Sequence, residues 1–343
     1  MSKISWVVAM FLVVGSSAQL AEAKKAAPAK PTPPKAPTAA SPPPASPKKP
    51  GPPPDKATSA KVNAYIELMN AESNHMFSLR EDWFKELPPG AQPTCKENVR
   101  LEPNIAPDRG KYEAYRKTLK AKPALSPDTS ALAMVDAAQA VWLIGKRSGP
   151  RAKSPGNAPN DVWCSKLKEV HPLMVDAFQK YAQGNDVVRA YVDAFVDDRD
   201  LREVDSVQKK YGKRYRYHFA LMALEGKLMM RKLRAELAKD APDAAVVHGI
   251  FASYFAVTDS AKTLYDAEPR PFKKEPVPPG LVFALTEVVP KLKRESVDLE
   301  KVLGKTADAK RAKSLDDSWG RVVNAYNEQI RYMNNTSFDA HQK

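Results

Sequence analysis

The sequence predicts an all-α protein: an elongated multi-helix bundle that follows a signal peptide and a disordered linker rich in proline and lysine. Long segments place apolar residues at steps of three and four, and only an α-helix brings such residues to one side. No segment shows the alternation of apolar and polar residues that indicates paired strands. Thirteen of the 31 prolines lie between residues 24 and 55, outside these helical segments. We therefore expect helices alone in the folded part.

Residues 1–23 are typical of a secretory signal peptide. Lys3 supplies a positive start, residues 6–14 form an apolar core, and Ala21-Glu22-Ala23 is a small-x-small cleavage site. We expect cleavage between Ala23 and Lys24. The apolar run is shorter than the roughly 20 residues of a membrane span, although an uncleaved N-terminal anchor is the alternative. The prediction is a periplasmic or secreted protein whose mature chain has no transmembrane helix.

Residues 24–60 form a linker of low complexity. Eight lysines between residues 24 and 61 oppose a single acidic residue, Asp55, so this stretch supplies +7 of the net charge of +14. Its prolines favour an extended, polyproline-like spacer. We expect this basic tail to be a solvated tether that attracts an anionic envelope polymer or an envelope protein. Because the chain is exported, nucleic acid is not an expected partner.

The folded domain is expected over residues 61–337, before a short tail at 338–343. Pro88-Pro89-Gly90 ends its first helix. Ser126-Pro127-Asp128 has the chemistry of a helix start, with Ser as the cap and Pro in the first turn. The expected helical segments are 61–87, 111–120, 126–146, 160–237, 242–264, 281–303 and 314–333.

The segment from Leu201 to Leu237 carries the clearest helical periodicity, and we expect it to be the central rod of the bundle. Before it, the acidic run 197–200 predicts a turn, with a local irregularity later at Gly212. The same run lacks the spaced oxygen ligands and central Gly of a calcium loop. Capping or solvated charge is therefore the expected role of its aspartates.

Two further details concern the last helices. Pro290 predicts a kink in the helix over 281–303. Ser314, three residues before Asp317, predicts the cap of the final helix.

The chain contains two cysteines, Cys95 and Cys164. Export exposes them to an oxidising compartment, so we predict a disulfide between them. Closing so long a loop stabilises by about 4 kcal/mol in the chain-entropy model. Two buried free thiols are the alternative.

Glu72-x-x-His75 is half of the ligand pattern of a di-iron bundle site, which needs a second Glu-x-x-His and more carboxylates. The sequence has no second copy, and we predict neither a metal nor another cofactor. Glu72 falls on the apolar stripe between Met69 and Met76. A buried carboxylate paired with a neighbouring base is therefore expected.

His218 lies on the apolar stripe of the rod, and Glu225 follows two turns later. A core histidine with satisfied hydrogen bonds is one interpretation. The alternative is a polar pocket between helices, lined by Glu72, His218 and Glu225, which would make the protein a small-ligand sensor.

Five basic residues between 209 and 216 lie beside three tyrosines, a combination that can bind polyanions. Long basic side chains that cover the surface of the bundle explain the pattern equally well. The sequence contains no phosphate-binding Gly-rich loop, no Gly-x-Ser-x-Gly elbow and no His-Glu-x-x-His motif. A hydrolase or metalloenzyme is thus the less favoured alternative, and no catalytic residue is assigned.

Four segments resemble the YiiG-like domains of bacterial envelope proteins, whose function is unknown. They are KVNAYIELMN at 61–70, KLKEVHPLMVDAFQKY at 166–181, YGKRYRYHFALMALEGKLM at 211–229 and RVVNAYNEQIRYMN at 321–334. The resemblance implies an exported, all-helical domain whose members are often lipoproteins. This chain has no lipid-acceptor cysteine near the cleavage site, which implies a soluble mature form. We expect a non-enzymatic binding or scaffolding protein of the bacterial envelope.

Overall fold

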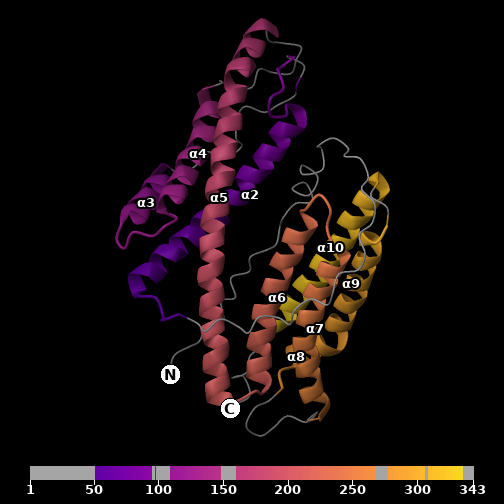
Figure 1. Cartoon of the computed structure of the whole chain (residues 1–343). Helices are drawn as coiled ribbons and strands as arrows, with labels where there is room; N and C mark the ends of the chain where they lie inside the picture. The colour runs from indigo at the N-terminus through magenta and orange to yellow at the C-terminus, as the bar shows by residue number, and fades with distance from the viewer. Residues whose placement is uncertain are drawn as a thin grey trace. The chain divides into compact units, whose positions relative to one another are not determined.

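A computed structural model describes residues 51–94, 97, 109–147, 160–267, 277–305 and 308–334. Within these ranges every regular element is a helix, which confirms the all-α prediction (Figure 1). The elements are α2 (Lys56–Glu86), α3 (Arg109–Lys120), α4 (Asp128–Arg147), α5 (Asn160–Tyr211), α6 (Tyr215–Leu237), α7 (Ala244–Ala267), α8 (Pro279–Phe283), the π-helical turn η1 (Ala284–Val288), α9 (Val289–Leu303) and α10 (Ala309–Asn334). None of these helices combines the length and hydropathy that would let it cross a membrane.

The chain divides into two compact units where the sequence predicts one domain. Residues 51–198 form the first, here called the N-terminal unit, and the helices after residue 198 belong to the second, the C-terminal unit. The division falls inside α5, between Asp198 and Arg199. A continuous helix needs no glycine, proline or polar linker at such a point. Composition therefore gives no signal of this boundary.

The N-terminal unit is built from α2, α3, α4 and the first part of α5. Aromatic residues pack between α2 and α5, where the rings of Phe84 and Phe178 meet edge to face at 5.7 Å. At Gly184, α5 approaches α4 so closely that a Cβ would lie 2.6 Å from Cγ of Met134. The first and last residues of the unit also meet, because the Gly51 N–H donates to Oδ1 of Asp198 at 2.9 Å.

The turn predicted at residues 197–200 was wrong, because α5 continues through this run to Tyr211. Val196 and Val204, on either side of the run, are both buried, so the apolar stripe is not interrupted. Asp200 forms an ion pair with Lys227 of α6. The three aspartates are half-buried along α5, and charged residues do not by themselves end a helix.

The single rod predicted from Leu201 to Leu237 was also wrong, since this segment is a helical hairpin. α5 ends at Tyr211, and Gly212 follows with φ +72°, in the left-handed region that suits glycine. The chain then begins α6 at Tyr215. The irregularity expected at Gly212 is in fact the turn.

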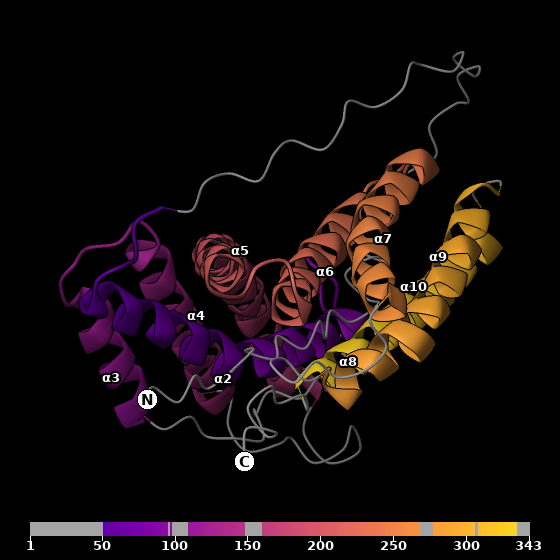
Figure 2. The same cartoon turned by 90° about the horizontal axis from the view of Figure 1, so that it is seen from below.

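The C-terminal unit is a bundle in which α6 packs along α7 and α9 packs along α10 (Figure 2). Its larger core cluster includes Leu233, Phe251, Leu292, Trp319 and Val322, all buried. These residues come from α6, α7, α9 and α10, so all four long helices share one core.

A second core cluster closes one end of this bundle. It joins the start of α6 (Tyr215), helix α8 (Leu281), the π-helical turn (Leu285) and the end of α10 (Met333). Tyr215 also donates from its hydroxyl to the carbonyl of Leu264, near the end of α7, at 3.5 Å. The α5–α6 turn therefore belongs to the same end of the unit as the last residues of α10.

Three helix boundaries refine the sequence predictions. α2 begins at Lys56, within the predicted linker, because the Asp55 carboxylate accepts from the Thr58 N–H at 2.6 Å. α10 is preceded by Asp308, which accepts from the Arg311 N–H at 2.6 Å, so the cap predicted at Ser314 was wrong. A kink was predicted at Pro290, and the structure has the π-helical turn η1 just before this residue, where proline offers no N–H for a regular helical bond.

Candidate functional site

The three residues of the predicted ligand pocket are divided between the two units. Glu72 lies on α2 in the N-terminal unit, whereas His218 and Glu225 lie on α6 in the C-terminal unit. Neither unit by itself brings the three together. Each residue is therefore best understood from its own surroundings.

Glu72 is buried inside the N-terminal unit. It belongs to a row of paired polar groups, here called the polar seam, that includes Tyr112, Ser73, Tyr181 and Asn185. Its Oε2 accepts from the Tyr112 hydroxyl at 3.2 Å, and its Oε1 lies 3.6 Å from Nζ of Lys111. The expected pairing of this buried carboxylate with a base is confirmed. Burial, followed by the charge of Glu72, raises the pKa of Tyr112, so the phenol stays protonated and remains a donor.

The seam continues next to Glu72 at Ser73, which links α2 to α5. The Ser73 hydroxyl donates to Oδ1 of Asn185 at 3.0 Å and lies 3.1 Å from the Tyr181 hydroxyl. All three residues are buried. Polar groups in a low-dielectric core cost free energy unless they are paired, and these groups pair with one another.

His218 is buried, and its Nδ1 has no hydrogen-bond partner among the described residues. Burial, reinforced by the nearby charge of Lys213, lowers the pKa of His218 from its ordinary 6.5. The imidazole is thus held neutral, and the folded state loses stability as pH falls through 6.5 because the unfolded chain binds the proton more readily. The structure differs here from a histidine with satisfied hydrogen bonds.

Glu225 lies seven residues after His218, about 10 Å further along α6 at the helical rise of 1.5 Å per residue. Burial raises the pKa of its carboxyl group. Two turns of helix separate the two side chains, so they form no direct acid–base pair.

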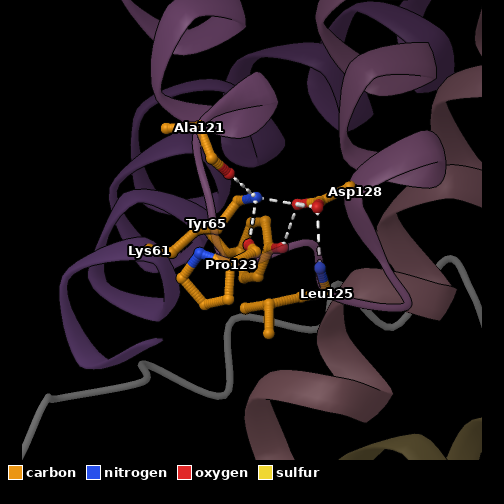
Figure 3. Close-up of polar contacts among 6 residues, drawn as sticks. All are labelled: Lys61, Tyr65, Ala121, Pro123, Leu125 and Asp128. Carbon is orange, nitrogen blue, oxygen red and sulfur yellow. Dashed lines mark hydrogen bonds and ion pairs between the residues drawn. The ribbon is translucent and has the colours of Figure 1, made fainter. Parts of the chain in front are cut away.

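A dense polar cluster, which the sequence analysis missed, surrounds Lys61 at the start of α2 (Figure 3). The Lys61 side chain is 3% exposed. Its Nζ donates to the carbonyls of Ala121 and Pro123 at 2.7 and 2.9 Å, and to Oδ2 of Asp128 at 2.7 Å. An ammonium group has three N–H bonds, and this one uses all of them.

The carboxylate of Asp128 is equally occupied. Oδ1 accepts from the Tyr65 hydroxyl at 2.5 Å, and Oδ2 accepts from the Leu125 N–H at 2.8 Å in addition to Lys61. Burial raises the pKa of Asp128, but the bonds from Lys61 and Tyr65 outweigh burial and hold it below its ordinary value. The cluster ties α2 to the α3–α4 connection and to the first residue of α4.

One sequence signal pointed to this cluster. Lys61 stands four residues before Tyr65, and residues at this spacing share one face of a helix. A lysine on the same face as a core tyrosine is a candidate for a buried, paired charge. The remaining partners lie 60 to 67 residues further along the chain, where no local pattern connects them with Lys61.

Another buried histidine, His171 of α5, packs against Trp83 of α2. The Trp83 indole N–H donates to Nδ1 of His171 at 3.1 Å, and the two rings stack with an angle of 12° between their planes. This bond places the proton of the neutral ring on Nε2. Burial lowers the pKa of His171.

The basic segment between α5 and α6 forms an exposed turn. Lys209, Lys210, Lys213 and Arg214 are all exposed. The charged groups of Lys210 and Arg216 lie 5.0 and 4.9 Å from the ring centroid of Tyr211, within the range of cation–π attraction. Lys209 pairs with Asp205 at 2.6 Å, one helical turn earlier. These basic side chains cluster at the hairpin tip.

Cys164 lies half-buried in α5, and Cys95 falls outside the described residues, so their pairing stays a prediction. The cleavage site at Ala23 and Lys24 also lies outside them. Within the ranges that the structure describes, no group of three or more His, Cys, Asp or Glu side chains is placed to hold a metal ion.

Comparison with protein-family models, with curated proteins and with solved structures finds no match to this chain. The assignment of function therefore depends on the residues themselves.

Proposed function

We propose that this protein is an exported, non-enzymatic helical binding or scaffolding protein of the bacterial cell envelope. The sequence supports export through its predicted signal peptide. The resemblance of four segments to YiiG-like envelope domains supports the same setting. In this proposal the protein is a periplasmic or secreted helical bundle, preceded by a cationic arm formed by residues 24–50.

The observation that best supports this proposal is that the hydrogen-bond donors around Lys61 are all used within the protein. A lysine, a tyrosine and a carboxylate in one place are groups from which acid–base catalysis is often built. Here each of the three N–H bonds of Lys61 is committed to an acceptor within 2.9 Å. The groups stabilise the packing of α2 on α4 and leave no donor for a substrate, as a rigid binding scaffold requires.

The first experiment compares the full protein with a variant that lacks residues 24–50, by crosslinking in cells and affinity purification. The deletion ends before Asp55, so the cap of α2 and the Gly51 bond to Asp198 are both retained. We expect specific envelope components in the crosslinked fraction. Loss of these partners with the arm assigns the contact to the arm, whereas retention assigns it to the helices.

Two results would contradict the proposal. One is recovery of the full protein, with its N terminus uncleaved, in the cytoplasmic fraction. The other is a crosslinked fraction that contains no envelope component for either form of the protein.

We also propose the disulfide between Cys95 and Cys164 as part of the exported form. Denatured protein purified from the periplasm without reductant is expected to have no titratable thiol, and to gain two after reduction. The same protein made in a reducing cytoplasm provides the control and should titrate with two thiols directly. Two reactive thiols in the periplasmic sample would exclude the disulfide.

A further inference from the structure

The α5–α6 turn and the adjoining end of the C-terminal unit form an exposed surface that is both cationic and aromatic. Lys209, Lys210, Lys213 and Arg214 protrude at the turn, around the half-buried ring of Tyr211. The turn contributes no carboxylate of its own, and Asp205, the nearest preceding acid, pairs with Lys209. The cations therefore outnumber the anions at the turn.

A second aromatic group lies at the same end of the bundle. The ring of Phe283, the last residue of α8, lies 4.2 Å from the ring of Tyr332, at the end of α10, measured between centroids. Phe283 is 37% exposed, and the guanidinium of Arg331 lies 5.2 Å from the Tyr332 centroid. The core cluster that contains Tyr215, Leu281 and Met333 holds these two groups and the turn together.

We propose that this end of the C-terminal unit docks on the surface of an anionic lipid bilayer. The inference rests on the proposed function, because it names an envelope partner for the helical unit itself. Clustered Lys and Arg side chains bind anionic head groups, and tyrosines are favoured at the depth of the head groups. A hairpin tip is convex, which suits a flat membrane better than it suits a single polymer strand that needs a groove.

The geometry of the turn fixes the backbone that carries these side chains. Gly212, at φ +72°, allows a connection of only three residues between α5 and α6. The core residue Tyr215 anchors the start of α6 immediately after it. A short, anchored turn presents its charges with little loss of backbone conformational entropy on binding.

The test measures cosedimentation of the purified mature chain with vesicles made of equal parts of phosphatidylglycerol and phosphatidylcholine. The variant carries Lys209→Gln, Lys210→Gln, Lys213→Gln and Arg214→Gln, which change exposed side chains only. Each basic residue near an anionic surface contributes about 1 kcal/mol, which corresponds to a loss of about a hundredfold or more in apparent affinity when four are removed. Circular dichroism and thermal unfolding establish that the variant is folded.

A matched control removes the same charge from the other end of α9 and α10. It carries Lys301→Gln, Lys305→Gln, Lys310→Gln and Lys313→Gln, four exposed lysines in a stretch that contains no aromatic residue. We expect the loss of binding free energy in this control to be less than about a third of the loss in the turn variant. An equal loss in both variants would mean that net charge alone drives binding, and would overturn the proposal.

Two further arms identify the source of the anionic groups. Vesicles of phosphatidylcholine alone should not retain the protein, and raising the salt above about 0.1 M should weaken binding because surface charges are screened. Polyphosphate in solution serves as the probe for a soluble polyanion. If it binds through the turn while the anionic vesicles do not, the membrane is excluded as the partner. Because vesicles contain no cellular protein, failure here leaves the crosslinking test of the proposed function intact.

Discussion

Replacing Gly184 by alanine is expected to destabilise the N-terminal unit by about 3 kcal/mol, near the upper end of the range for overpacked cores. A Cβ at this position would lie 2.6 Å from Cγ of Met134 and 2.7 Å from the carbonyl oxygen of Ser130. The methionine side chain has other rotamers, but the carbonyl belongs to the backbone of α4 and moves only with the helix. The helix preference of alanine offsets no more than about 1 kcal/mol.

Urea denaturation followed by circular dichroism and tryptophan fluorescence measures this effect. Gly249→Ala is the control, because a Cβ at that helical glycine of α7 meets nothing within 4 Å. The control is expected to be neutral or to gain up to about 1 kcal/mol. A Gly184→Ala protein as stable as the wild type would show that α4 and α5 are not in close contact.

Replacing Lys61 by methionine is expected to cost about 3 to 5 kcal/mol, the range for removing one partner of a buried ion pair. The substitution keeps most of the aliphatic volume but removes three hydrogen bonds at once. It leaves the Asp128 carboxylate without its cation and two carbonyls without a donor. Lys180→Met is the control, because Lys180 is 63% exposed in its pair with Asp176 and such pairs contribute less than about 1 kcal/mol.

The pH dependence of unfolding provides an independent readout of the same cluster. The folded-state pKa of Asp128 lies below its ordinary value of 3.8. Its contribution is therefore present above pH 3.8 and is lost as pH falls through the folded-state pKa. Lys61→Met should flatten this acid limb, and adding Asp128→Asn should recover part of the lost stability because no buried charge then remains. An unchanged acid limb in Lys61→Met would contradict the assigned pairing.

Sequence periodicity predicted most of the helices but not the partners of their polar residues. The stripes identified α2, α6 and α10 because burial on one face is a local property of a helix. The turn after α5 was misplaced because four charged residues at 197–200 look like a loop, whereas a lone glycine at 212 looks like a minor irregularity. Charges are tolerated on the surface of a long helix, and a left-handed residue is not tolerated inside one.

The candidate sites show the same limit. Burial and pairing of Glu72 were predictable from its place between Met69 and Met76 on the apolar stripe. The prediction that Glu72 shares a pocket with His218 and Glu225 depended on the tertiary arrangement of the helices. The sequence alone does not specify that arrangement. The pair of Lys61 and Asp128 could not be predicted in this way. The two residues are 67 positions apart, and helical periodicity relates only residues within one helix.

The hydrogen bond between Gly51 and Asp198 places the two ends of the N-terminal unit side by side. Consider a pulling force applied through residue 50 by a partner that holds the chain upstream. The force enters the unit at Gly51. Gly51 is bonded to Asp198, and the chain leaves the unit from Asp198 into Arg199. Tension between the upstream segment and the C-terminal unit therefore acts across this junction, and the core of the N-terminal unit is loaded only after the Gly51 bond to Asp198 has broken.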